Sequence, residues 1–170
     1  MDRNSAWARY SVQNMNTYLY DSVYWDPPTK FKWTHEKPVP LETTESIRIY
    51  EAHVGMAQEF ERVSSYRDFA DYNLDRIVAA GYNTIQLMAI QEHSYYASFG
   101  YHVTSFFSVS SRSGTPDDFK YMVDKAHEKG LRVVIDLIHS HASSNVNDGI
   151  KLFDGSDSCY SHAGDRGHHT

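Results

Sequence analysis

The feature that most constrains the fold is an alternation of short apolar runs with capped helical segments from residue 46 onward. Runs that are apolar on both faces and separated by helices favour a parallel β-sheet covered by helices. Both a doubly wound sheet and a (β/α)₈ barrel begin with this pattern, and in either fold the chemistry collects where strands end and loops begin. The predicted strands are residues 47–54, 84–90 and 131–138.

The two predicted helices have clear start and stop signals. Ser65, with an acid three residues later, is a capping signal for a helix from about Tyr66, and Gly81 is placed to end it. Thr115 precedes a proline and two acids, which suits the positive N-terminal end of a second helix. Gly130 is expected to end that helix.

Residues 1–45 differ from the rest because tyrosines and tryptophans alternate there with polar residues and prolines interrupt them. This pattern predicts one or two short strands with turns, followed by an extended linker. We therefore expect a domain boundary between residues 45 and 46.

Charge and cysteine content narrow the function classes. The formal net charge is −6 and no basic stripe occurs, so we expect neither nucleic acid nor an anionic membrane as partner, whereas a neutral substrate fits. No apolar run approaches the ~20 residues of a membrane span. The N-terminus lacks the layout of a secretory signal. Cys159 is the single cysteine, so we expect no internal disulfide, a reducing compartment and a structural role.

A long aromatic connection follows the second predicted strand. Its length of ~24 residues exceeds the usual ~2–6 of a βα-loop, which indicates a function for it. Its aromatic side chains have two interpretations, stacking on a sugar ring or packing the loop onto the fold. They are Tyr95, Tyr96, Phe99 and Tyr101.

Polar side chains mark the end of the third predicted strand. Asp136 lies in an apolar run, so its carboxylate needs a cation or several hydrogen-bond donors from elsewhere in the fold. His139 and His141 follow, and a His-x-His pair is compatible with a zinc site, with hydrogen bonding to a polar ligand or with packing. Further histidines in the tail would have to complete a zinc site: His162, His168 and His169.

Taken together and in order, several stretches resemble the eukaryotic glycogen- and starch-branching enzymes of the α-amylase superfamily. The resemblance covers nearly the whole chain. The runs that separate branching enzymes from ordinary amylases are RIYEAHVG and YYASFGY. The other stretches are DSVYWDPP, VVIDLIHSHAS and FDGSDSCYSHAGDRGHH, together with the sequence flanking the second run from YNTIQLMAI to SSRSGTP.

The resemblance implies an α/β fold and a division of roles. Residues 1–45 would be the end of a carbohydrate-binding β-sandwich, and residues 46–170 the first three strands and two helices of an incomplete (β/α)₈ TIM barrel. It implies that Tyr101 stacks on the glucosyl unit at the cleavage site, that His141 hydrogen-bonds it, and that Asp136 orients the charged network of the site.

The same resemblance implies the reaction, in which an α-1,4-glucan is cut and transferred to form an α-1,6 branch. The nucleophilic Asp, the acid/base Glu and an arginine partner of Asp136 would lie beyond Thr170, so we expect no catalytic residue here and no activity from this segment alone. The expected partners are glycogen, amylose or amylopectin, without metal or other cofactor. The expected location is the cytoplasm, or the plastid for a plant-type enzyme.

Two alternatives remain open from the residues themselves. One is a non-catalytic glucan-binding fragment, because the aromatic loop and His141 suffice for binding. The other is a metal-dependent TIM-barrel hydrolase built on His139 and His141, for which stoichiometric zinc in the purified chain would be the sign.

Overall fold

The computed structural model describes residues 3–38 and 46–162 of the chain. Contacts divide the chain into two compact units, each assembled from separate stretches of sequence. Unit 1 comprises residues 1–25, 89–111 and 137–170, and unit 2 comprises residues 26–88 and 112–136. The predicted boundary between residues 45 and 46 lies at the edge of the undescribed residues 39–45, so that division stays a prediction.

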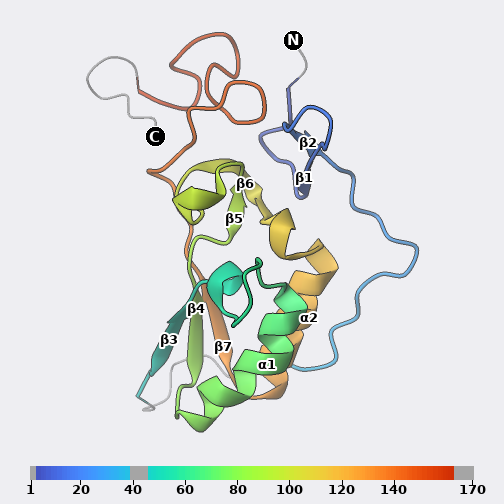
Figure 1. Cartoon of the computed structure of the whole chain (residues 1–170), viewed down its shortest axis with the longest axis vertical. Helices are drawn as coiled ribbons and strands as arrows, with labels where there is room; N and C mark the ends of the chain where they lie inside the picture. The colour runs from blue at the N-terminus through green and yellow to red at the C-terminus, as the bar shows by residue number, and fades with distance from the viewer. Residues whose placement is uncertain (1–2, 39–45, 163–170) are drawn as a thin grey trace. The chain divides into compact units, whose positions relative to one another are not determined.

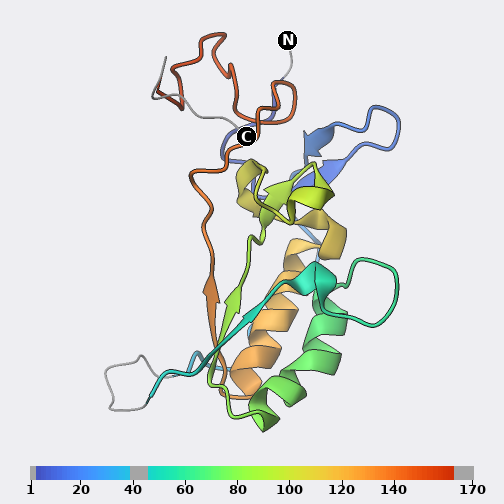
Figure 2. The ribbon, with the colours of Figure 1, turned by 60° about the vertical axis from the view of Figure 1, so that its left-hand side comes forward.

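Unit 2 contains a parallel three-stranded sheet with the order β3-β4-β7. The strands are β3 (Ile49–Ala52), β4 (Thr84–Leu87) and β7 (Arg132–Ile135). Two helices, α1 (Tyr66–Ala79) and α2 (Pro116–Glu128), pack against each other and lie along one face of this sheet (Figures 1 and 2). Short 3₁₀ turns cover Val54–Met56 and Ser111–Ser113. The predicted parallel sheet covered by helices is confirmed.

Both helices begin and end where their capping residues predict. The Ser65 side chain accepts a hydrogen bond from the Asp68 N–H. Thr115 and Asp118 form a reciprocal capping box, with each side chain accepting from the other residue's N–H. Positive φ angles at Gly81 (84°) and Gly130 (74°) reverse the chain after each helix, a conformation that glycine adopts without steric cost.

The core of unit 2 lies between its helices and its sheet. Ile85 and Leu87 of β4 are each 1% exposed, and they alternate with Gln86, which points to the other face. That other face is less covered, because Ile49 is 48% and Val134 49% exposed. The core-facing side chains of the helices are Tyr66, Phe69, Leu74, Ile77, Met122 and Ala126.

A segment of extended chain is tied to helix α2 within unit 2. The buried carboxylate of Asp124 accepts hydrogen bonds from the backbone N–H groups of Thr34 and His35, both at 3.0 Å. It also accepts from the Thr34 hydroxyl and lies 3.1 Å from His35 Nδ1. Nearby, the Trp33 ring stacks on His127 with the ring centroids 6.1 Å apart. We refer to residues 33–35 as the strap.

Unit 1 contains two antiparallel pairs of strands. Strand β1 (Ser11–Gln13) pairs with β2 (Tyr20–Ser22), and β5 (Gln91–His93) pairs with β6 (Val103–Val109). A 3₁₀ turn, Tyr96–Ser98, lies in the connection between β5 and β6. The pair β1–β2 agrees with the predicted short strands, whereas the assignment of residues 1–45 to a β-sandwich stays a prediction.

The strands are shorter than predicted, and the long connection is more ordered. Strand β4 ends at Leu87 rather than at Ile90, because Ala89 takes a positive φ of 42°. The connection of ~24 residues contains the hairpin β5–β6 rather than plain loop. Across residues 3–38 and 46–162, none of the helices has the length and apolar character needed to cross a bilayer.

Candidate glucan-binding site

The candidate site in unit 1 is centred on Tyr101 and His141. Their rings form an edge-to-face pair with centroids 5.9 Å apart and planes inclined at 88°. The backbone holds the two segments together, because Val103 N–H donates to the His141 carbonyl at 2.9 Å and Ser143 N–H donates to the Val103 carbonyl at 2.8 Å. Two site residues predicted from the sequence, 40 positions apart, therefore lie side by side.

A tight turn sets the position of Tyr101. Phe99 (φ 55°) and Gly100 (φ 94°) both have positive φ, and Tyr101 N–H donates to the Ser98 carbonyl at 3.0 Å. Gly100 also lies against the backbone of Ala89, where a Cβ atom on residue 100 would be 2.3 Å from the Ala89 carbonyl oxygen. The Phe-Gly-Tyr run therefore requires glycine at its centre, both for its φ and for this close approach.

Glu92 is a buried residue of this region that the sequence reasoning missed. Its side chain is 0% exposed, and its carboxylate accepts from His93 N–H at 3.1 Å and from Ser111 N–H at 2.7 Å. Its backbone carbonyl accepts from the Thr104 hydroxyl at 3.2 Å. Glu92 thus fixes both ends of the β5–β6 hairpin that carries Tyr101. An acid between Gln91 and His93 has no sequence signal that distinguishes it from a surface residue.

The other loop aromatics mostly contact neighbours on the loop. Tyr95 is 59% exposed and its ring centroid lies 5.8 Å from that of His102. Tyr96 stacks on His93 at 6.3 Å. Phe99 is 46% exposed. The local packing of Tyr95 and Tyr96 is therefore confirmed, whereas stacking of the loop aromatics on a sugar ring stays a prediction.

Asp136 belongs to unit 2, at the end of β7. It lies on the sheet face away from the helices, two residues after Val134, which pairs with Gln86 of β4, and Gln86 in turn pairs with Glu51 of β3. Gln86 Nε2 donates to Asp136 Oδ1 at 2.8 Å and lies 3.5 Å from Glu51 Oε1. Among the described residues Asp136 makes no ion pair, so the Gln86 amide, rather than a cation, is the partner of this half-buried carboxylate.

The hydrogen bond from Gln86 to Asp136 predicts a specific response to substitution at Gln86. Gln86→Leu removes the donor to Asp136, and we expect the free energy of unfolding to fall by about 1–2 kcal/mol. Gln86→Glu should destabilise the chain more, because it places a carboxylate between those of Glu51 and Asp136. Urea denaturation of both variants measures the difference. Equal stability of the two variants at pH 7 would contradict this role for Gln86.

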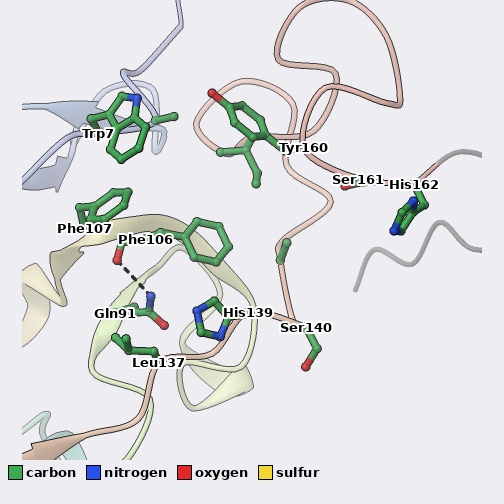
Figure 3. A pocket seen from close by; sticks show the side chains of 13 residues that line it. Trp7, Gln91, Phe106, Phe107, Leu137, His139, Ser140, Tyr160, Ser161 and His162 are labelled. Atoms are coloured by element: carbon green, nitrogen blue, oxygen red, sulfur yellow. Dashed lines mark hydrogen bonds between the residues drawn. The ribbon is translucent and has the colours of Figure 1, made fainter.

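The structure separates the two histidines of the proposed metal site. The His141 ring packs on Tyr101, whereas His139 lines a cavity that His141 does not line (Figure 3). Within residues 3–38 and 46–162, no group of three or more His, Cys, Asp or Glu side chains is placed to hold a metal ion. His168 and His169 lie outside the described residues. Cys159, predicted to be structural, is exposed.

A comparison with known families identifies the family to which this fold belongs. Residues 72–161 match the family described as "Alpha amylase, catalytic domain". The chain therefore belongs to the α-amylase family. Its parallel β-α-β units are accordingly part of a barrel-type α/β fold, which favours the barrel over the doubly wound sheet.

Individual relatives make the similarity more specific. The chain is 56% identical over 174 residues to the 1,4-alpha-glucan-branching enzyme, chloroplastic/amyloplastic, of Oryza sativa subsp. japonica, covering 99% of this chain and 21% of that protein. It is 52% identical over 170 residues to the 1,4-alpha-glucan-branching enzyme of Rhizophagus irregularis, with 99% and 24% coverage. The chain thus spans about a fifth to a quarter of the length of these relatives.

A solved structure supports the fold alone. The trehalose-6-phosphate hydrolase TreA of Bacillus licheniformis superimposes with a TM-score of 0.55 at 22% sequence identity. The alignment covers 67% of this chain and 20% of that chain.

Proposed function

We propose that the chain supplies a substrate-positioning part of a 1,4-α-glucan branching enzyme, which cuts an α-1,4-linked chain and transfers it to a 6-hydroxyl. The observation that carries this proposal is the 56% identity over 99% of the chain to the rice branching enzyme. The edge-to-face pair of Tyr101 and His141 is in keeping with it, because it combines an aromatic face with a hydrogen-bonding imidazole.

Each predicted site residue has a role in this proposal. Tyr101 stacks on the glucosyl unit next to the bond that is cut, and His141 hydrogen-bonds a hydroxyl of the same unit. Asp136, held by Gln86, orients the charged groups of the site. Binding of this kind positions a sugar, but cleavage with retention needs a carboxylate nucleophile and a carboxylic acid about 5–5.5 Å apart. We assign neither of these carboxyl groups to the 170 residues.

The proposed substrate is a neutral α-glucan, whether glycogen, amylose or amylopectin. A net charge of −6 is compatible with a neutral polysaccharide and unfavourable for an anionic one. The proposed location is the cytoplasm, or the plastid if the protein shares the location named for the rice relative. We do not propose the metal-dependent alternative, because the relatives at 52–56% identity are branching enzymes.

The proposal predicts binding without transfer for the 170-residue chain. Titration with maltoheptaose, followed by NMR, should show saturable binding, and Tyr101→Ala should weaken it about five- to tenfold through loss of the stacking face. Tyr72→Ala is a matched control, because Tyr72 is 69% exposed on α1 and belongs to unit 2. The NMR signal of new α-1,6 linkages should be absent with this chain.

A longer protein that contains these residues should form α-1,6 linkages from amylose. Tyr101→Ala in that protein should lower the transfer rate, and Tyr72→Ala should leave it unchanged. Transfer by the 170-residue chain itself would contradict the placement of both catalytic carboxyl groups outside it. Unchanged binding and transfer in Tyr101→Ala would contradict the role of Tyr101.

A further inference from the structure

Unit 1 contains a cavity of about 630 Å³ that neither Tyr101 nor His141 lines. This volume falls in the ~300–1,000 Å³ range typical of small-ligand sites. Its walls come from three stretches of sequence, all of them in unit 1. The side chains that line it are those of Ala6, Trp7, Gln91, Phe106, Phe107, Leu137, His139, Ser140, Ala142, Ile150, Tyr160, Ser161 and His162 (Figure 3).

Hydrogen bonds hold the N-terminal wall of this cavity against strand β6. The Ser108 hydroxyl donates to the Ala8 carbonyl at 2.8 Å, and the hydroxyl oxygens of Ser11 and Ser105 are 3.3 Å apart. These contacts place Trp7 over Phe107, with ring centroids 4.8 Å apart and planes inclined at 23°. Trp7 is nevertheless 70% exposed, so it offers a supported, accessible aromatic surface.

The Gln91 side chain links strand β6 to the segment that follows β7. Its Nε2 donates to the Phe106 carbonyl at 3.0 Å, and its Oε1 accepts from Ile138 N–H at 2.7 Å. Asp148 lies two positions before the lining residue Ile150, and it accepts from Tyr20 N–H at 3.1 Å and from Asn145 Nδ2 at 2.8 Å. The three walls are therefore fixed to one another by contacts that do not use a ligand.

The lining has the chemistry of a site for a neutral sugar. Among the described residues that line it there is no Asp, Glu, Lys or Arg, so these side chains offer a charged ligand no counter-charge. Aromatic faces at Trp7, Phe107 and Tyr160 suit the apolar faces of pyranose rings. Hydroxyl and imidazole groups at Ser140 and His139 can exchange hydrogen bonds with sugar hydroxyls.

We propose that this cavity is a second α-glucan-binding site, distinct from the pair formed by Tyr101 and His141. The choice of α-glucan among neutral sugars rests on the proposed function. The segment from His139 to His141 serves both sites, since His139 lines the cavity and His141 packs on Tyr101. A glucan held at this second site would be tethered to the protein without occupying the first.

The test labels the 170-residue chain with 5-fluorotryptophan, which gives ¹⁹F signals for Trp7, Trp25 and Trp33. Titration with maltoheptaose should shift the Trp7 signal saturably and leave the Trp33 signal in place. The Trp7 shift should persist in Tyr101→Ala. In a parallel calorimetric titration in the Tyr101→Ala background, where the second site dominates, Trp7→Ala should weaken binding about five- to tenfold, whereas Trp33→Ala, a matched change at a residue 54% exposed in unit 2, should not.

Three outcomes would overturn this inference. The first is a Trp7 signal that stays in place while maltoheptaose binds elsewhere on the chain. The second is an equal shift with cellohexaose, which would remove the preference for α-linked chains. The third is a Trp7 signal that moves with protein concentration in the absence of sugar, which would make a second copy of the chain the occupant. Each readout is independent of α-1,6 transfer, so failure of the proposed function would be seen separately.

Discussion

Gly100→Ala is expected to lower the free energy of unfolding by about 3 kcal/mol and to weaken glucan binding at Tyr101 by up to about five- to tenfold, the loss expected for Tyr101→Ala. The left-handed conformation costs an alanine about 1–2 kcal/mol. The clash with Ala89 adds about 1–3 kcal/mol, because the new Cβ atom would lie 2.3 Å from a backbone oxygen and 2.7 Å from the Ala89 Cβ. Relief of that clash moves the residue next in sequence, Tyr101, away from His141.

Gly81→Ala separates the cost of the left-handed conformation from the cost of the clash with Ala89. Gly81 has a similar φ of 84°, but a Cβ atom there would meet nothing within 4 Å. We therefore expect a loss of about 1 kcal/mol and unchanged glucan binding. Chemical denaturation and maltoheptaose titration of the two variants provide the comparison. Equal losses of stability would show that the contact with Ala89 contributes nothing.

Asp124→Ala is expected to release the strap and to destabilise the chain by about 2–4 kcal/mol. The substitution removes the acceptor for two backbone N–H groups and the Thr34 hydroxyl, as well as the contact with the His35 ring. Asp124→Asn keeps one acceptor oxygen and the side-chain shape, so we expect a smaller loss of about 1–2 kcal/mol. Faster amide exchange at Thr34 and His35 in Asp124→Ala would identify the released segment.

The difference in the free energy of unfolding between the wild type and Asp124→Asn should depend on pH. Burial alone would raise the pKa of Asp124, but hydrogen bonds from Thr34 and His35 outweigh it and hold the pKa well below its ordinary value. A depressed pKa means that the unfolded state binds a proton first as the pH falls. The stabilisation by the carboxylate is therefore complete above about pH 4 and decreases progressively below it.

The wild type and Asp124→Asn must be compared at each pH, because His127 also makes the stability of both proteins depend on pH. Burial lowers the pKa of His127, with the charge of Asp124 opposing that shift. Stability therefore also decreases as the pH falls through the ordinary histidine range near 6.5. This loss occurs in the wild type and in Asp124→Asn, so most of it cancels in their difference. A difference that stays constant from pH 7 to pH 2 would contradict the role of the Asp124 charge.

The helices were the most predictable part of the fold. Ser65 and Thr115 cap their helices through local contacts that span three residues, and Gly81 and Gly130 follow the helix ends. Such signals act over a few residues and do not depend on the tertiary fold. For this reason they can be identified in the sequence without knowing what the helices pack against.

The strand ends and the hairpin were less predictable for a different reason. Residues 88–90 continue an apolar run, yet Ala89 turns the chain with a φ of 42°, and a positive φ at alanine has no sequence signal. The β-branched and aromatic residues of Val103–Val109 were a usable signal for a strand. That segment was instead interpreted as part of a long loop, and its partner β5, only three residues long, is too short to give a pattern that reveals the hairpin.

The sequence named the candidate site residues but not the residues that hold them in place. Tyr101 and His141 were identified through the resemblance, and the structure brings them together. Glu92 and Gln86 act through contacts with residues 19 and 50 positions away, which no local pattern encodes. The assignment of Tyr101, Asp136 and His141 to substrate binding stays a prediction that the substitutions above examine.

The interleaving of the two units has a consequence for biosynthesis. Tyr20 and Asp148 are 128 positions apart in the chain, yet they share a hydrogen bond inside unit 1. Ribosomal synthesis adds ~5–20 residues per second, so Asp148 is synthesised roughly 6–26 s after Tyr20. During that interval the N-terminal aromatic residues, Trp7 among them, lack their final neighbours. The nascent polypeptide is therefore expected to need chaperone protection early, and to fold late rather than vectorially.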